Sequence, residues 1–145
     1  MNTDALNTFI QQAIPFIARS ELKILEATSG YVKLMMPFAV NKNHVGSMYA
    51  GAQFTVAELT GGIIFMSSFD TKLFYPLVKE VNIRYKAPMQ GDAFVEAKLS
   101  AEEIANIQSE LESKGKADFS LDMQVANAQG DVAAIVRGLY QGRKF

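Results

Sequence analysis

Cysteine is absent from the 145-residue sequence, and histidine occurs only once, as His44. Without cysteine the chain can form no disulfide, no thiol nucleophile and no thiolate metal site. A single imidazole also argues against a histidine-based metal site. We therefore expect no metal and no redox cofactor. The missing cysteine also fits a reducing compartment such as the cytoplasm.

The sequence also lacks an excess of charge and a long apolar run. The chain has 14 Lys and Arg residues and 15 Asp and Glu residues, so its net charge is -1. No basic surface for nucleic acid is indicated, and the longest apolar runs are far shorter than a membrane span. The first residues do not have the pattern of a signal peptide. We expect a cytoplasmic protein that binds neither nucleic acid nor membrane.

The remaining composition is that of a folded domain. About half of the residues are hydrophobic (49%) and a fifth are charged (20%), as in ordinary globular chains. There is no internal repeat, low-complexity tract or linker. We therefore expect a single domain over residues 1–145.

Hydrophobic periodicity and turn residues divide the chain into nine elements. Apolar residues at helical spacing precede Pro15, and a Ser29-Gly30 turn joins the first two strands. Ser100 followed by Glu103 is a capping-box pattern that starts the last helix. The expected elements are helices near 6–14, 49–68 and 101–113, and strands at 21–28, 31–38, 77–88, 93–100, 117–125 and 132–141.

The loops are expected at 39–47, 70–76, 89–92 and 127–131. In strand 77–88, Val81, Ile83 and Tyr85 share one face. The residues of strand 117–125 alternate most clearly between apolar and polar. The mixture of apolar residues in strand 132–141 predicts burial on both faces, as in the middle of a sheet.

These elements predict an α+β fold in which six mostly antiparallel strands form one sheet. The helix over 49–68 is too hydrophobic to lie in water, so it must lie on the concave face of that sheet. Its residues form two stripes at helical spacing. The sheet-facing stripe is Ala52, Val56, Leu59, Ile63 and Met66, and the second, small and polar, is Gly51, Thr55, Glu58 and Gly62.

Glu58 is the one charged residue of this helix, and two interpretations of it are open. A carboxylate in such a segment is costly unless it has a partner or reaches water. Glu58 either pairs with a backbone group or a base at an interface, or it is a general base or nucleophile with a shifted pKa. The neighbouring Gly61-Gly62 pair, unfavourable in a helix, indicates that a partner chain or a ligand approaches closely.

The start of this helix favours the catalytic interpretation. Its unpaired N–H groups, near Tyr49, Ala50 and Gly51, can bind an anion or polarise a carbonyl. The small residues Ala50 and Gly51 leave that approach open. These N–H donors precede the carboxylate by two helical turns and lie on the same face. Such an arrangement is suited to acyl transfer.

At this point the chain resembles the hot-dog-fold acyl-CoA thioesterases. In the phenylacetyl-CoA-type branch an Asn is followed, after five residues, by His-Gly-Gly and then by a helix with Leu-Ala-Asp. Asn43, Tyr49-Ala50-Gly51 and Val56-Ala57-Glu58 fall on these positions. The stretch VNIRYKAPMQGD is similar to a later part of the family pattern, and the resemblance covers most of the chain from Glu21 onward.

The resemblance implies a role for each matching residue. Asn43 would place the attacking water or the thioester, and the N–H of Ala50 or Gly51 would polarise the thioester carbonyl. Glu58 would activate water or attack directly, on substrate held mainly by a second subunit. Thr55 would hydrogen-bond to Glu58 or to the water.

The resemblance also implies a binding region and an assembly. Arg84 and Lys86 would lie near the CoA phosphates, although an ordinary polar strand face explains them equally well. A homodimer or a dimer of dimers with sites between subunits is expected, and CoA enters only as part of the substrate. The chain departs from the pattern at Tyr49, Ala50 and Glu58, which replace His, Gly and Asp.

His44 lies beside Asn43 but out of register with the family histidine. We interpret it first as a loop residue and second as a residue that contacts substrate. A non-catalytic module that binds acyl-CoA is the alternative function. A hydratase of the same fold ranks below both, because that chemistry uses an Asp–His pair and His44 has no such Asp.

Overall fold

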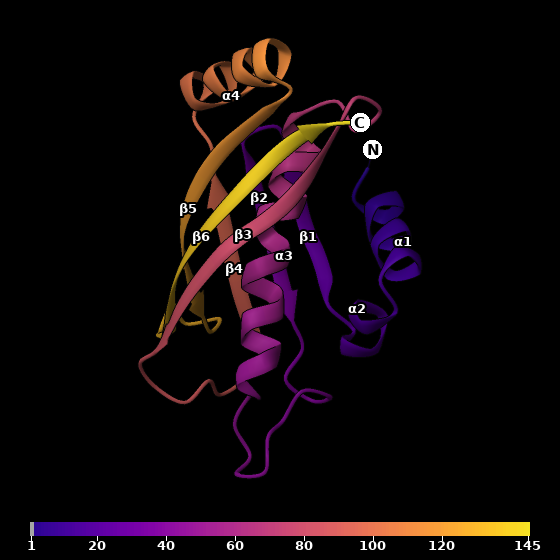
Figure 1. Cartoon of the computed structure of the whole chain (residues 1–145). Coiled ribbons are helices and arrows are strands. Elements are labelled where there is room, and N and C mark those ends of the chain that lie inside the picture. The colour runs from indigo at the N-terminus through magenta and orange to yellow at the C-terminus, as the bar shows by residue number, and fades with distance from the viewer. Residues whose placement is uncertain (1) are drawn as a thin grey trace.

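The computed structural model, which describes residues 2–145, shows a six-stranded antiparallel sheet wrapped around one long helix (Figure 1). This confirms the predicted α+β architecture. The strands lie in the order β1-β2-β4-β5-β6-β3. The elements are α1 Thr3–Ala13, α2 Pro15–Ser20, β1 Lys23–Thr28, β2 Tyr31–Met36, α3 Ala50–Ser68, β3 Phe74–Tyr85, β4 Ala93–Lys98, α4 Ala101–Lys114, β5 Lys116–Ala126 and β6 Val132–Lys144.

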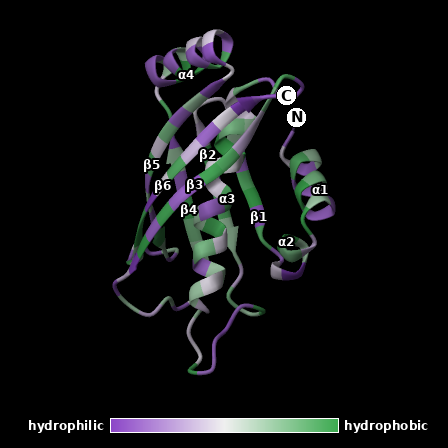
Figure 2. Ribbon diagram, in the orientation of Figure 1, coloured by the Kyte–Doolittle hydropathy of each residue, from purple (hydrophilic) through white to green (hydrophobic). Residues whose placement is uncertain are grey.

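The hydrophobic core lies between α3 and the concave face of the sheet. Val56, Ile63 and Ile64 of α3 are completely buried, and the helix is hydrophobic around most of its circumference (Figure 2). The aromatic rings of Phe65, Phe119 and Tyr140 stack in series, with centroids 5.8 and 5.4 Å apart. The predicted sheet-facing stripe of α3 is therefore confirmed, except that its last residue, Met66, is only partly buried.

Local sequence signals account for most element boundaries. The Ser100 Oγ accepts a hydrogen bond from the Glu103 N–H, and the Glu103 carboxylate accepts one from the Ser100 N–H, which completes the predicted capping box. Gly115 ends α4 in the left-handed conformation, which glycine adopts without strain. The apolar residues of β5 are buried, apart from the partly buried Ala126 at its end, and alternate with exposed polar residues. The hairpin turn at Ser29-Gly30 is likewise confirmed.

Two local predictions are wrong and one is incomplete. β3 begins at Phe74 and ends at Tyr85, so it includes part of the expected connection and leaves Lys86 outside. Pro15 does not only end a helix but also begins α2, because proline suits the first turn, where its missing N–H has no partner anyway. β6 is central but is buried on one face only, with Ile135 exposed. α3 covers only the concave face of the sheet.

The two edges of the sheet differ in how they are covered. β1 lies under α1, and the Asn7 side chain donates to the Ile24 carbonyl and accepts from the Ile24 N–H. β3 forms the opposite edge and pairs only with β6. Within the described part of the chain, no helix is long and apolar enough to cross a membrane.

Candidate functional site

Glu58 lies halfway along α3 with its side chain half-buried. Among residues 2–145 the carboxyl group has neither an ion-pair partner nor a hydrogen-bond donor. Burial raises the pKa of this carboxyl above its ordinary value of 4.5, because desolvation disfavours the charged form. Within one chain the structural interpretation of Glu58, a carboxylate paired with a base, therefore has no partner to support it.

The helical turn that carries Glu58 is held by Tyr140. The buried Tyr140 hydroxyl donates to the Glu58 carbonyl oxygen at 3.0 Å, and a Cβ on Gly61 or on Gly138 would overlap the Tyr140 ring. The close approach predicted at the Gly61-Gly62 pair is thus explained, at Gly61, by a side chain of the same protein. At Gly62 a Cβ would meet nothing within 4 Å, so this side of the helix is open.

Tyr49 is the N-cap residue of α3, and its side chain makes no capping hydrogen bond. Its ring lies over the first helical turn, because a Cβ on Gly51 would overlap it. Among the described residues, no acceptor takes the N–H of Ala50 or Gly51, whereas those of Ala52 and Gln53 reach the Tyr49 carbonyl. Of the three amides predicted to be free, those of Ala50 and Gly51 are therefore free within the described chain, whereas the Tyr49 N–H donates to the Asn41 carbonyl at 2.8 Å.

Two hydroxyl groups contact the first turn of α3. Thr55 donates to the Gly51 carbonyl at 2.7 Å, so the structure shows it bound to its own helix rather than to Glu58. Tyr85, the last residue of β3, donates to the Ala50 carbonyl at 2.8 Å. Sequence reasoning missed Tyr85 as a site residue. Its place after Val81 and Ile83 on the helix-facing side was the available signal.

The side chain of Asn43 is used within its own loop. Its Oδ1 accepts from the N–H groups of Val45 and Ser47 at 2.9 and 3.1 Å, and its Nδ2 donates to the Ser47 Oγ at 2.9 Å. This side chain therefore shapes the turn that leads into α3. A direct role of Asn43 on substrate stays a prediction.

The predicted substrate-binding residues are exposed and separate from Glu58. His44 lies in the same loop as Asn43. Arg84 is on the outer face of β3, opposite Ile135, and Lys86 follows the strand, where its N–H donates to the Ala133 carbonyl. Among the described residues, neither cation forms an ion pair. No three His, Cys, Asp or Glu side chains in residues 2–145 are grouped to hold a metal.

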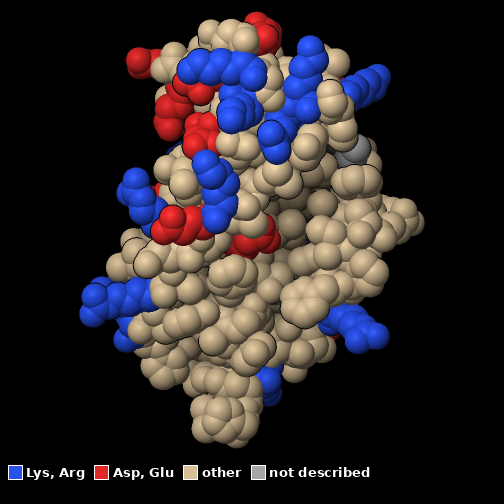
Figure 3. Space-filling model, in the orientation of Figure 1, with Lys and Arg blue, Asp and Glu red and all other residues tan. Residues whose placement is uncertain are grey.

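Charged side chains are unevenly distributed on the face shown in Figure 3. They gather in the upper half, over α4 and the nearby strands, while the lower central part, over the start of α3, is largely uncharged. The open side of α3 therefore borders a surface with few charges. Such a surface suits the apolar part of a ligand.

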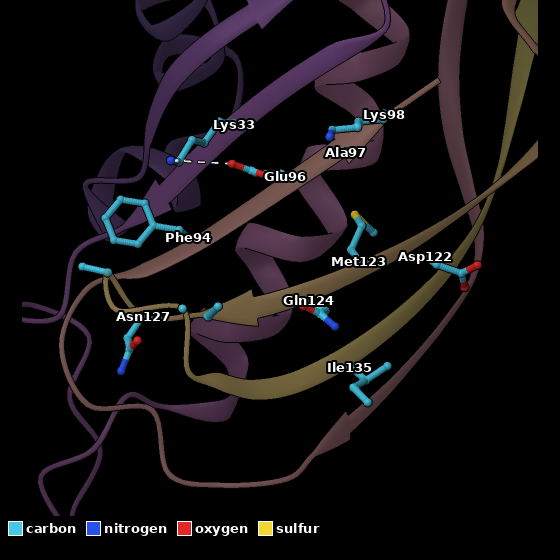
Figure 4. Close-up of a pocket in the computed structure, with 13 residues that line it drawn as sticks. Lys33, Phe94, Glu96, Ala97, Lys98, Asp122, Met123, Gln124, Asn127 and Ile135 are labelled. Carbon is cyan, nitrogen blue, oxygen red and sulfur yellow. Dashed lines mark ion pairs between the residues drawn. The ribbon is translucent and has the colours of Figure 1, made fainter. Parts of the chain in front are cut away.

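A large hollow lies elsewhere, on the outer face of the sheet (Figure 4). β4 and β5 pair only at Phe94 and Ala126 and then diverge, which leaves a cleft of about 720 Å³. Ala97 and Met123 line the cleft. Lys33 and Glu96 also line it, and the Lys33 Nζ forms an ion pair with the Glu96 Oε1 at 3.6 Å. Because its charges are partly paired and Glu58 is not among its residues, we do not assign the chemistry to this cleft.

Comparisons with known proteins agree on family and fold. Residues 3–143 match the family model described as "Putative thioesterase (yiiD_Cterm)". A Pseudomonas aeruginosa protein of unknown function, described as a probable thioesterase, is 46% identical, with a TM-score of 0.92 over 100% of this chain and 97% of that one. A search among curated proteins gave no match.

Two further solved structures are less similar in sequence. A protein from Shewanella oneidensis, described as a "putative thioesterase", is 25% identical, with a TM-score of 0.80 over 96% of this chain and 95% of that one. A thioesterase from Haemophilus influenzae is 11% identical, with a TM-score of 0.78 over 99% and 92%, and shows the fold alone. The family model and the 46% identical relative show that this chain belongs to that thioesterase family and has the hot-dog fold.

Proposed function

We propose that this protein hydrolyses an acyl-CoA or acyl-carrier thioester on the open side of α3. One observation carries the proposal. Glu58, a half-buried carboxyl without a partner among residues 2–145, lies on the same helical stripe as Gly51, whose amide is free within those residues. Backbone donors aimed at a developing negative charge, together with a base of raised pKa, are the two elements that thioester hydrolysis requires.

The geometry of the helix suits this division of roles. Glu58 is seven positions after Gly51, about 10 Å along the axis at 1.5 Å per residue. Helical side chains lean toward the N-terminus, so the carboxyl reaches back toward the amides.

The reaction then proceeds in two balanced steps. The thioester oxygen accepts from the Gly51 N–H, and Glu58 takes a proton from water as the water oxygen bonds to the carbonyl carbon. The tetrahedral intermediate expels the sulfur, and Glu58 returns the proton to the thiolate. The products are a carboxylic acid and a free thiol. Direct attack by the Glu58 carboxylate, through an anhydride that water hydrolyses, is the variant of this mechanism.

We propose further that the site is completed by a second copy of the chain. Exposed edge strands are normally shortened, charged or covered, yet β3 has 12 residues and exposes Leu77, Val78 and Tyr85. A two-fold related copy paired along β3 would cover this edge and close the open side of α3. Substrate would then be held between the two copies, with CoA phosphates near Arg84 and Lys86.

The test is a free-thiol assay on a panel of acyl-CoA substrates of increasing chain length, including aromatic acyl groups. Glu58→Gln should lower kcat by about 10³-fold or more, as expected for a general base whose residual activity comes from the amide donors. Glu110→Gln, an exposed glutamate on α4, is the matched control and should match the wild type. Undiminished hydrolysis by Glu58→Gln would refute the catalytic role.

One observation favours the alternative, a module that binds acyl-CoA without hydrolysing it. The polar atoms of Asn43 are already bonded within the loop, and the Tyr49 ring lies over Gly51. If the wild type binds acyl-CoA in calorimetry but releases no thiol from any panel member, this alternative is correct.

A further inference from the structure

Tyr85 contacts the peptide group on which the proposed carbonyl polarisation depends. Its hydroxyl donates to the carbonyl oxygen of Ala50 at 2.8 Å. That carbonyl and the N–H of Gly51 belong to the same peptide unit. Among the described residues, the Gly51 N–H has no acceptor. The Tyr85 hydroxyl therefore binds the carbonyl end of the peptide whose N–H end faces the proposed substrate site.

A hydrogen bond to a peptide oxygen strengthens the N–H of the same peptide. Hydrogen bonds in a chain polarise one another, by about 10–30% per bond in the condensed phase. The sequence of groups is the Tyr85 hydroxyl, the Ala50 carbonyl, the Gly51 N–H and then the thioester oxygen. In this chain the hydroxyl both fixes the direction of the Gly51 N–H and increases its positive charge.

The surroundings of Tyr85 keep this hydroxyl a donor. Burial and the neighbouring Tyr49 raise the pKa of Tyr85 above its ordinary value, so the group is protonated at neutral pH. The side chain is still 44% exposed, and it ends β3 on the face that turns toward α3. Other bonds secure the helix start, such as those from the Tyr49 N–H to Asn41 and from Gln53 to Met48.

We propose that Tyr85 is a positioning residue, which orients and polarises the peptide between Ala50 and Gly51 for the thioester carbonyl. This inference rests on the proposed function. It adds a residue that neither the motif positions nor the sequence pattern indicated as part of the site.

The kinetic test is Tyr85→Phe, which removes one oxygen atom and keeps the ring. Because the Gly51 N–H remains, the loss should be smaller than the 10²–10³-fold cost of deleting an oxyanion donor, about tenfold in kcat, with KM changed less than about twofold. The melting temperature should change by less than about 5 °C. The matched control is Tyr31→Phe, which removes a hydroxyl bonded to Glu96 on the outer face and should leave kcat unchanged.

A spectroscopic measurement detects the polarisation itself. Hexanoyl-CoA labelled with ¹³C at the thioester carbonyl is bound to Glu58→Gln, which should not hydrolyse it, and the carbonyl stretch is recorded by infrared difference spectroscopy. Adding Tyr85→Phe should move this band toward the frequency of free hexanoyl-CoA. A purely structural role of Tyr85 would not move it.

The outcomes separate this inference from the proposed function. A tenfold lower kcat together with the shifted band supports the role of Tyr85. Equal kcat and an equal band in a wild type that hydrolyses thioesters would overturn it, and so would a fall in kcat that only follows a fall in melting temperature. If the wild type binds hexanoyl-CoA without hydrolysing it, the proposed function fails, and the band alone decides the role of Tyr85.

Discussion

The two edges of the sheet are built in opposite ways. β1 has six residues with an irregularity at Leu25, lies under α1, and has both backbone groups of Ile24 satisfied by Asn7. β3 is twice as long, and no helix of the described chain covers its free edge. One edge is covered by the chain itself, and the other is uncovered within the described residues.

This difference places the open edge beside the candidate site. β3 ends at Tyr85, which contacts the start of α3, and a Cβ at Gly62 of α3 would meet no atom of the described residues within 4 Å. A natural protein normally protects such an edge because it invites pairing with other chains. We therefore take pairing along β3 and closure of the Glu58 site to be one event, and each prediction below tests a part of that view.

The largest effect is expected at the open edge. Val78→Lys places a charge on the concave side of β3, where the side chain is 46% exposed in one chain and would be buried in the pair. The variant should be monomeric and inactive, as measured by analytical ultracentrifugation and the free-thiol assay.

The matched control lies on the other edge. Leu25→Lys changes a side chain on β1 that is 40% exposed and should leave both the dimer and the activity intact. A monomeric wild type, or a Val78→Lys variant that still dimerises, would contradict pairing through β3.

The second effect distinguishes the two faces of α3. Gly61→Ala forces a methyl group into the Tyr140 ring and should lower the free energy of unfolding by about 3 kcal/mol, the upper range for overpacking. Gly62→Ala meets no atom within 4 Å and should raise helix stability by up to about 1 kcal/mol. Urea unfolding measures both variants. Equal destabilisation by the two alanines would show that both faces are packed.

The third effect tests how the covered edge is held. Asn7→Ala removes both hydrogen bonds to the backbone of Ile24, which leaves two partly buried groups without partners. The free energy of unfolding should fall by about 1–3 kcal/mol, while kcat is unchanged. Thr8→Ala, whose exposed hydroxyl bonds only to Asp4 within α1, is the control and should change stability by less than about 0.5 kcal/mol. If Asn7→Ala and Thr8→Ala match, the Asn7 bonds do not secure the edge.

The smallest effect concerns pH and Glu58. Its pKa is raised by burial, so between the ordinary value of 4.5 and the raised value the folded state holds a proton that the unfolded state has released. The free energy of unfolding contributed by this group therefore falls as pH rises through that interval. Glu58→Gln should melt above the wild type at pH 8, with the difference gone below pH 4.5. Calorimetry across pH measures this, and a difference independent of pH would exclude titration of Glu58 as its cause.

Most of the fold could be predicted because it depends on local signals. Alternation identified β5, and the Ser100–Glu103 box identified the start of α4. The unbroken hydrophobicity of α3 required a sheet around it. The errors arose where contacts between distant parts of the chain determined strand length and side-chain exposure. Ile135 looks buried in sequence but faces outward on β6, and Phe74 joins β3 because β6 extends far enough to pair with it.

The candidate site was predictable only in part. Glu58, Gly51 and Thr55 could be placed on one stripe because helical spacing alone determines it. The sequence could not show that the Thr55 hydroxyl donates to the Gly51 carbonyl. Nor could it show that the Asn43 side chain forms hydrogen bonds with Val45 and Ser47. These hydrogen bonds depend on rotamers and loop geometry, which a spacing pattern does not contain. Tyr85 was missed for a related reason, since 35 residues separate it from Ala50.

The sequence by itself determined the α+β class, the long buried helix and the position of its carboxylate, because these follow from the period of apolar residues. Only the tertiary structure decided which edge is open, which glycine meets Tyr140 and which hydroxyl reaches the Ala50 carbonyl. Those features arise from contacts between residues far apart in the chain. Such contacts are set by strand order and packing, and no local pattern encodes them.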